Sequence, residues 1–152
     1  MVTGPSGFLL DTNVVSELMK RRPSRLVAEW IEATREDFLY LSVITIGEIR
    51  KGIDVLDDDE PRRAALQSWL DRDVRVRFAD RLITFDVAVA ERWGHLEAQA
   101  KKQRIALPTI DAQLAATALH HGLTFVTRNT ADIRPTGVPV FNPWSDRDEY
   151  PG

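Results

Sequence analysis

The chain has no cysteine among its 152 residues. Disulfide bonds, thiolate zinc sites and cysteine nucleophiles are therefore excluded, which fits the reducing environment of the cytoplasm. The sequence also has no apolar run long enough to span a bilayer. Its first seven residues lack the basic and apolar regions of a secretory signal peptide. We therefore expect a cytoplasmic protein with no membrane partner, in which residues 1–7 form a flexible leader.

An excess of positive charge is also missing, because the formal net charge is −3. This argues against a protein that binds nucleic acid by bulk attraction alone. Positive charge is concentrated locally instead, at residues 20–25, 50–51 and 101–104. For any one of these clusters, a solvated helix end or face is the simpler explanation.

The composition, 43% hydrophobic and 28% charged, is typical of a single globular domain. Apolar spacing predicts strands at 8–10, 38–41, 124–127 and 139–141, and either a short strand or an extended link at 82–85. It predicts helices at 14–19, 24–33, 43–56, 62–73, 86–103 and 108–121. This order indicates an α/β fold at residues 8–141, a three-layer domain with a mainly parallel central sheet flanked by helices. Residues 142–152 are expected to form a loosely held C-terminal tail.

Acidic and amide side chains follow the predicted strands. Asp11 ends the first strand, and Glu48 lies off the buried stripe of the helix after the second. Asp111 falls in the first turn of a later helix, while Asn129 and Asp132 follow the fourth strand. Because these positions converge on the carboxyl edge of a parallel sheet, we expect the side chains to lie close together.

Each acid also has an ordinary structural explanation. Asp11 suits a helix N-cap, Glu48 a surface pair with Lys51, and Asp111 an interaction with the helix dipole. Their joint position favours a metal site, because Mg²⁺ binds through a few carboxylates and the substrate phosphate. Carboxylates this close repel one another and bind protons more readily when no cation is present. The cluster therefore indicates metal-assisted hydrolysis of a phosphodiester.

Four segments in fixed order carry a resemblance to a known family. They are Leu9-Leu10-Asp11-Thr12-Asn13 with Ser16-Glu17, Leu41-Ser42 with Gly47-Glu48-Ile49 and Gly52, Pro108 to Asp111 with Ala115, and Val126-Thr127-Arg128-Asn129 with Asp132. With them, residues 8–141 resemble the PIN-domain nucleases, and among these the VapC-type toxins of bacterial toxin–antitoxin pairs. Each segment alone is a weak signal, whereas their order and spacing together are specific.

The resemblance implies a Mg²⁺-dependent endoribonuclease, with Mn²⁺ as a substitute. Its catalytic residues would be Asp11, Glu48, Asp111, Asn129 and Asp132, and the first three would bind the metal ion. Many family members carry an acid where Asn129 stands, so an amide here weakens one anionic ligand and leaves open whether a second ion binds.

Three further polar residues are expected to support the site. Asn13 and Ser16 are candidates for tying down Asp11, and helix capping explains both equally well. Thr127, with Asn129, is expected to orient water or to hold the site through hydrogen bonds.

The resemblance also implies the toxin component of a type II toxin–antitoxin system. Its partners would be an RNA substrate, a second copy in a homodimer, and a cognate antitoxin of the VapB type in a hetero-oligomer. DNA would be contacted only through the antitoxin. The alternative is a catalytically weakened PIN-like module that binds RNA or a protein partner, and Asn129 keeps this alternative open. The RNA target and the role of Trp144 stay undetermined from sequence.

Overall fold

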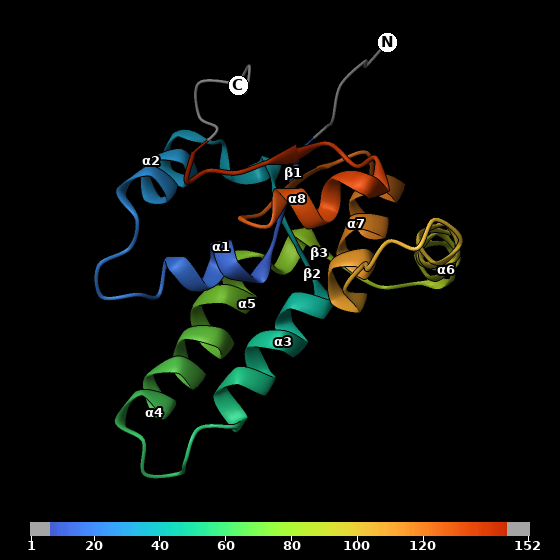
Figure 1. Ribbon diagram of the computed structural model, residues 1–152. Coiled ribbons are helices and arrows are strands. Elements are labelled where there is room, and N and C mark those ends of the chain that lie inside the picture. Colours follow the sequence, from blue (N-terminus) through green and yellow to red (C-terminus); the bar gives the residue numbers. More distant parts are fainter. Residues whose placement is uncertain (1–6, 146–152) are drawn as a thin grey trace.

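A parallel sheet of five strands forms the centre of the computed structural model, which describes residues 7–145 (Figure 1). The strand order is β3-β2-β1-β4-β5, and every neighbouring pair is parallel. The strands are β1 (Phe8–Leu10), β2 (Leu39–Ser42), β3 (Leu82–Ile83), β4 (Thr124–Val126) and β5 (Val140–Phe141). The predicted α/β architecture is confirmed, while the predictions for residues 1–6 and 146–152 lie outside the described residues.

Helices cover both faces of this sheet. They are α1 (Thr12–Glu17), α2 (Arg25–Ala33), α3 (Val43–Asp54), α4 (Pro61–Ser68), α5 (Arg75–Arg77), α6 (Val87–Lys102), α7 (Thr109–His121) and α8 (Thr130–Ile133). Short 3₁₀ segments lie at Glu36–Phe38, Ala79–Arg81 and Arg134–Thr136. None of the helices in the described part is both long and apolar enough to cross a membrane.

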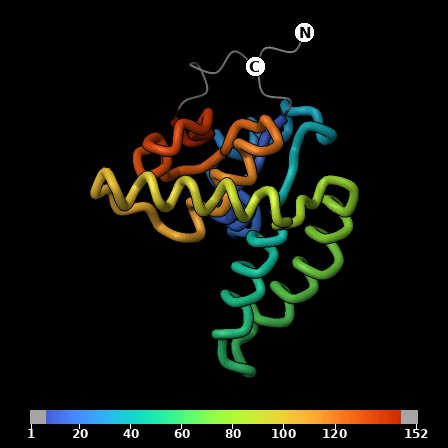
Figure 2. Tube along the Cα trace, turned by 90° about the vertical axis from the view of Figure 1, so that its right-hand side faces the viewer, coloured from blue at the N-terminus to red at the C-terminus, as the bar shows by residue number. Residues whose placement is uncertain are grey.

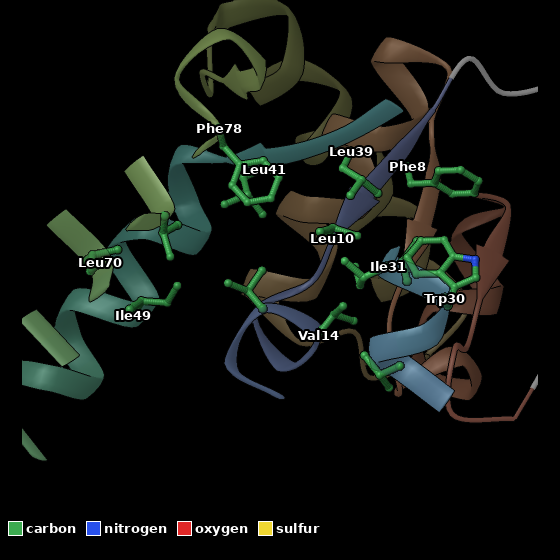
Figure 3. Close-up of a cluster of buried hydrophobic side chains, with 14 of the residues drawn as sticks. Phe8, Leu10, Val14, Trp30, Ile31, Leu39, Leu41, Ile49, Leu70 and Phe78 are labelled. Carbon is green, nitrogen blue, oxygen red and sulfur yellow. The ribbon is translucent and has the colours of Figure 1, made fainter. Parts of the chain in front are cut away.

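Side-chain alternation along β1 divides the core into two clusters. Phe8 and Leu10 face one side, where they pack with residues of α1, α2 and the helical run after α4 (Figure 3). Trp30 of α2 contacts Phe8 edge-on, with ring centroids 5.1 Å apart. Leu9 faces the other side and packs with α7, α8 and Phe125 of β4. Because both faces of β1 are buried, the strand reads as a continuous apolar run.

Local chemistry fixes most helix ends near their predicted positions. Ser24, Ser42 and Asp86 act as N-caps, each accepting a hydrogen bond from a backbone N–H of the next turn. Pro61 occupies the first turn of α4. Gly122 ends α7 in the left-handed conformation, with a φ of 66°.

The helix predicted at 62–73 is longer than expected. α4 continues through a π-helical stretch, η2 (Trp69–Val74), into α5, so the helical run reaches Arg77. The wider π turn carries both Leu70 and Val74 into the core. The pair formed by α3 and α4 projects away from the sheet (Figures 1 and 2).

Two glycine substitutions should change stability in opposite directions. Gly122→Ala places a side chain at a φ of 66° and should lower the free energy of unfolding by about 1–2 kcal/mol. Gly94→Ala, inside α6, should raise it by about 0.5–1 kcal/mol because alanine favours the helix. Neither added Cβ meets an atom within 4 Å. Urea unfolding measures both effects, and equal shifts in one direction would contradict this account.

Candidate functional site

Asp11 is buried where β1 ends and α1 begins. Its Oδ1 accepts the backbone N–H of Thr12 at 2.7 Å, so the carboxylate is the N-cap of α1. Its Oδ2 accepts the hydroxyl of Thr127 at 2.6 Å, just past the end of β4. Asp11 is therefore both a helix N-cap and a candidate site residue, because the capping bond holds its carboxylate at the carboxyl edge of the sheet.

Glu48 reaches the same edge from the second turn of α3. Its Oε1 accepts a short hydrogen bond from the hydroxyl of Thr12. The alternative of a surface pair with Lys51 is not found, because no ion pair joins the two side chains in the described part of the chain. Sequence reasoning missed Thr12 as a site residue, although its position beside Asp11 in the first matching segment was a signal.

Asp111 lies half-buried in the first turn of α7. Burial raises the pKa of its carboxyl, and the negative charges of Glu48 and Asp132 raise it further. The carboxylate of Asp111 therefore lies within electrostatic range of the acids on α3 and α8. The structure thus brings Asp111, Glu48 and Asp132 into electrostatic contact, as their positions at strand ends predicted.

The pKa of Asp11 rises from 3.8 to about 6. Burial is the main cause, and the charges of Asp111 and Glu48 add to it. The hydrogen bonds from Thr127 and Thr12 act in the opposite direction, because they stabilise the ionised form. The site therefore holds negative charge that is desolvated and mutually repelling, and a cation would relieve both costs.

Among the described residues, some of the predicted supporting residues hydrogen-bond within this network, whereas the side chains of Asn129 and Ser16 do not. The hydroxyl of Thr127 also accepts the backbone N–H of Asn129 at 3.0 Å and lies 3.5 Å from Nδ2 of Asn13. The side chain of Asn129 is exposed and does not cap α8. Ser16 is exposed on α1, and within residues 7–145 its hydroxyl makes no hydrogen bond with Asp11. The expected contact of Ser16 is therefore absent, because the helix turns that position outward.

The donor set fits a hard cation such as Mg²⁺. Carboxylate oxygens are its preferred ligands, and burial together with the neighbouring acids raises the pKa of Asp11 and of Asp111. The Oδ1 atom of Asn13 is buried without a hydrogen-bond partner, so it can accept from a water on such an ion. No three acidic or histidine side chains of the described residues are already grouped as a complete metal site. Asp11, Glu48 and Asp111 would therefore have to draw together around the ion.

A groove of about 890 Å³ opens beside the acids. Thr12 and Glu48 line it where it meets the sheet edge, and it extends between α1, α3 and α4. Leu66 and Trp69 contribute apolar surface, while its cationic residues are Lys20, Arg21 and Arg62. The groove thus combines an acidic inner end with a basic rim.

The protonation of Asp11 should be visible in the stability of the metal-free protein. The folded state keeps this proton up to about pH 6, whereas the unfolded chain releases it near pH 3.8. Stability should therefore fall as pH rises between these values, by about 2 kcal/mol from pH 4.5 to 7. Asp11→Asn should lose this part of the pH dependence, measured by urea unfolding in the presence of a chelator. Identical pH profiles for both proteins would contradict the raised pKa.

Comparison with known proteins agrees with this geometry. The PIN domain family matches residues 8–135. VapC ribonuclease Y4jK of Sinorhizobium fredii is 38% identical over 137 residues, which cover 90% of this chain and 97% of that protein. Toxin FitB of Neisseria gonorrhoeae is 36% identical over 139 residues, covering 91% and 99%.

Two solved structures share the fold along nearly its whole length. FitAcB from Neisseria gonorrhoeae has a TM-score of 0.85 at 35% identity, covering 91% of this chain and 99% of that one. FitAB bound to an IR36 DNA fragment has a TM-score of 0.84 at 34% identity, covering 90% and 95%. The chain therefore belongs to the PIN domain family, in the branch that contains the VapC-type toxins.

Proposed function

We propose that this protein is the toxin of a toxin–antitoxin pair and cleaves RNA with a Mg²⁺ ion held by Asp11, Glu48 and Asp111. The observation that carries the proposal is the buried Asp11 carboxylate, fixed by two hydrogen bonds and repelled by two further acids. Relatives named as a VapC ribonuclease and as toxin FitB support the choice of RNA and of toxin function.

Residues around the acids hold and orient the carboxylates of Asp11 and Glu48. Thr127 and the N-terminus of α1 fix the direction of the Asp11 carboxylate. Thr12 holds Glu48 toward the same point and would release it to a cation by rotating its hydroxyl. The bound ion would supply an activated water and would neutralise charge on the leaving oxygen. Mn²⁺ offers the same charge and oxygen preference, so it should substitute.

Charge distribution explains how an acidic site can accept RNA. A divalent cation would offset most of the negative charge of the three acids, and it could take the substrate phosphate as a further oxygen ligand. Lys20, Arg21 and Arg62 on the groove rim can then bind flanking phosphates. The net charge of −3 therefore does not exclude an RNA substrate.

The same groove suits an antitoxin segment. Its apolar surface at Leu66 and Trp69 belongs to the same groove as Glu48, so a peptide that fills the groove would cover this acid. The structure of FitAB bound to a DNA fragment supports a two-protein complex that binds DNA, and we expect the antitoxin to make that contact. We also propose that the protein forms a homodimer, as its resemblance to the family implies.

The alternative is a PIN-like module that binds RNA or protein without cleaving it. Asn129 in the place of an acid favours this alternative, because it removes one charge from the site. Metal-dependent cleavage decides between the two.

Purified protein should cleave RNA with Mg²⁺ or Mn²⁺ and stop when a chelator is added. Asp11→Asn, Glu48→Gln and Asp111→Asn should each lower the rate by at least about 100-fold, because each removes one anionic ligand. Asp59→Asn removes an exposed acid outside the site and serves as the matched control. Gel assays of RNA cleavage measure the rates, and circular dichroism checks folding. If the site variants cut as fast as the control, the nuclease proposal is wrong.

Expression of the protein alone should slow bacterial growth, and Asp111→Asn should restore it. Co-expression of the neighbouring upstream reading frame should relieve the wild-type effect if it encodes the antitoxin. Leu66→Glu in the groove should keep the toxicity but lose the relief, because it places a charge on the apolar surface. Val76→Glu, at an exposed apolar position on α5, is the control and should be relieved normally. Growth curves with equal relief of both variants would place the antitoxin elsewhere.

A further inference from the structure

The carboxyl edge of the sheet continues past the acids. Because the strand order is β2-β1-β4-β5, the residues after β4 and β5 extend the row that starts with Glu48 and Asp11. Arg128 follows β4, and Trp144 lies shortly after β5. The edge therefore presents two acids, then a cation, then an aromatic ring.

Arg128 and Trp144 are stacked on each other. The guanidinium carbon of Arg128 lies 4.2 Å from the centroid of the Trp144 ring. Trp144 itself is anchored, because it packs against the core cluster of β1 and its backbone N–H donates to Asn142 at 2.8 Å. A cation on an aromatic face loses orientational freedom while its N–H groups stay available at the edge of the plane. The ring therefore holds an exposed guanidinium at a fixed place beside the site.

Within residues 7–145, no acidic side chain forms a close ion pair with Arg128. Both oxygens of Glu17 are occupied, by Lys20 at 2.9 Å and by the backbone N–H of Ser24 at 2.7 Å. Arg128 acts on this carboxylate only from farther away: burial raises the pKa of Glu17, but Lys20, Ser24 and Arg128 together lower it below its ordinary value. Within residues 7–145 the guanidinium makes no hydrogen bond and no close ion pair. Its donors are thus available to an anion from outside.

The position of Arg128 also limits what it can bind. Thr127 directs its hydroxyl to Asp11, and the next side chain turns to Trp144 on the other side. The guanidinium of Arg128 is therefore directed toward Trp144, although Arg128 follows Thr127 directly in the chain. A guanidinium in such a place suits a phosphate next to the scissile one, which it can bind through two parallel hydrogen bonds.

We propose that Arg128, stacked on Trp144, binds an RNA phosphate flanking the scissile one, so that the strand runs from the acids toward β5. The inference rests on the proposed nuclease function, because it names a contact of the same substrate. Arg128 is then a positioning residue for the substrate, and Trp144 keeps its guanidinium oriented.

The experiment uses a mixed-sequence, single-stranded RNA oligonucleotide with a fluorescent label. Cleavage by the full chain in Mg²⁺ gives kcat and KM. Fluorescence anisotropy in an Asp111→Asn background gives Kd between 50 and 300 mM salt, a range over which the Debye length falls to less than half. If the wild type does not cleave, the proposed function fails, whereas the binding measurements still decide the role of Arg128.

Arg128→Gln should raise Kd and KM about tenfold and lower the salt slope of log Kd by about 0.7, the value for one phosphate contact on a single strand. Arg128→Lys should restore the slope but not the full affinity, because an ammonium group lacks the two-pronged geometry. Trp144→Leu should weaken binding less than Arg128→Gln and keep the slope, since the charge remains. Arg134→Gln is the matched control and should change neither, because Arg134 is an exposed arginine in the same stretch of chain whose side chain makes no hydrogen bond or ion pair within residues 7–145.

Three results would overturn the proposal. The first is an unchanged Kd and salt slope in Arg128→Gln. The second is an equal loss in Arg134→Gln, which would indicate bulk charge instead of a specific contact. The third is a loss in kcat that Arg128→Lys does not relieve and that accompanies a lower Tm, which would indicate a structural role.

Discussion

The hydrogen bond from Thr127 to Asp11 is the interaction on which the site depends. It joins the ends of two neighbouring strands, β1 and β4, through a carboxylate that also caps α1. Because Asp11 is buried, the two donors that hold it are also what keeps its negative charge tolerable in the metal-free protein. The orientation of the Asp11 carboxylate, its charge and the capping of α1 thus depend on one side chain. A change in any of them alters the other two.

The surrounding structure explains how this concentration of charge is sustained. Repulsion among Asp11, Glu48 and Asp111 opposes folding, and it has to be offset by the apolar clusters on the two faces of the sheet. β1 is buried on both faces, so it can be held rigidly while the next residue, Asp11, lies in an acidic site. A cation would relieve the repulsion, and the protein would then gain stability and a ligand shell together.

The sequence predicted the fold because it follows local rules, and it predicted which acids lie at the sheet edge. Short continuous apolar runs located the strands, spacing of period 3.6 located the helices, and polar residues at strand ends pointed to Asp11, Glu48 and Asp111. Boundaries were less accurate where packing decides them: α1 begins two residues earlier than predicted, and the run from α4 continues to Arg77 through a π turn. Ser16 was expected to contact Asp11 and does not, whereas Thr12 was overlooked and holds Glu48.

The sequence by itself determined which acids are candidates for the chemistry, since carboxylates after buried strands are visible in the order of the letters. Only the tertiary structure decided which side chains hold these acids by hydrogen bonds, and that the guanidinium of Arg128 lies near the same sheet edge. The Thr127–Asp11 bond joins residues 116 positions apart, and the stack of Arg128 on Trp144 joins the ends of β4 and β5. Such contacts depend on strand order and on side-chain direction, and neither has a local signal in the chain.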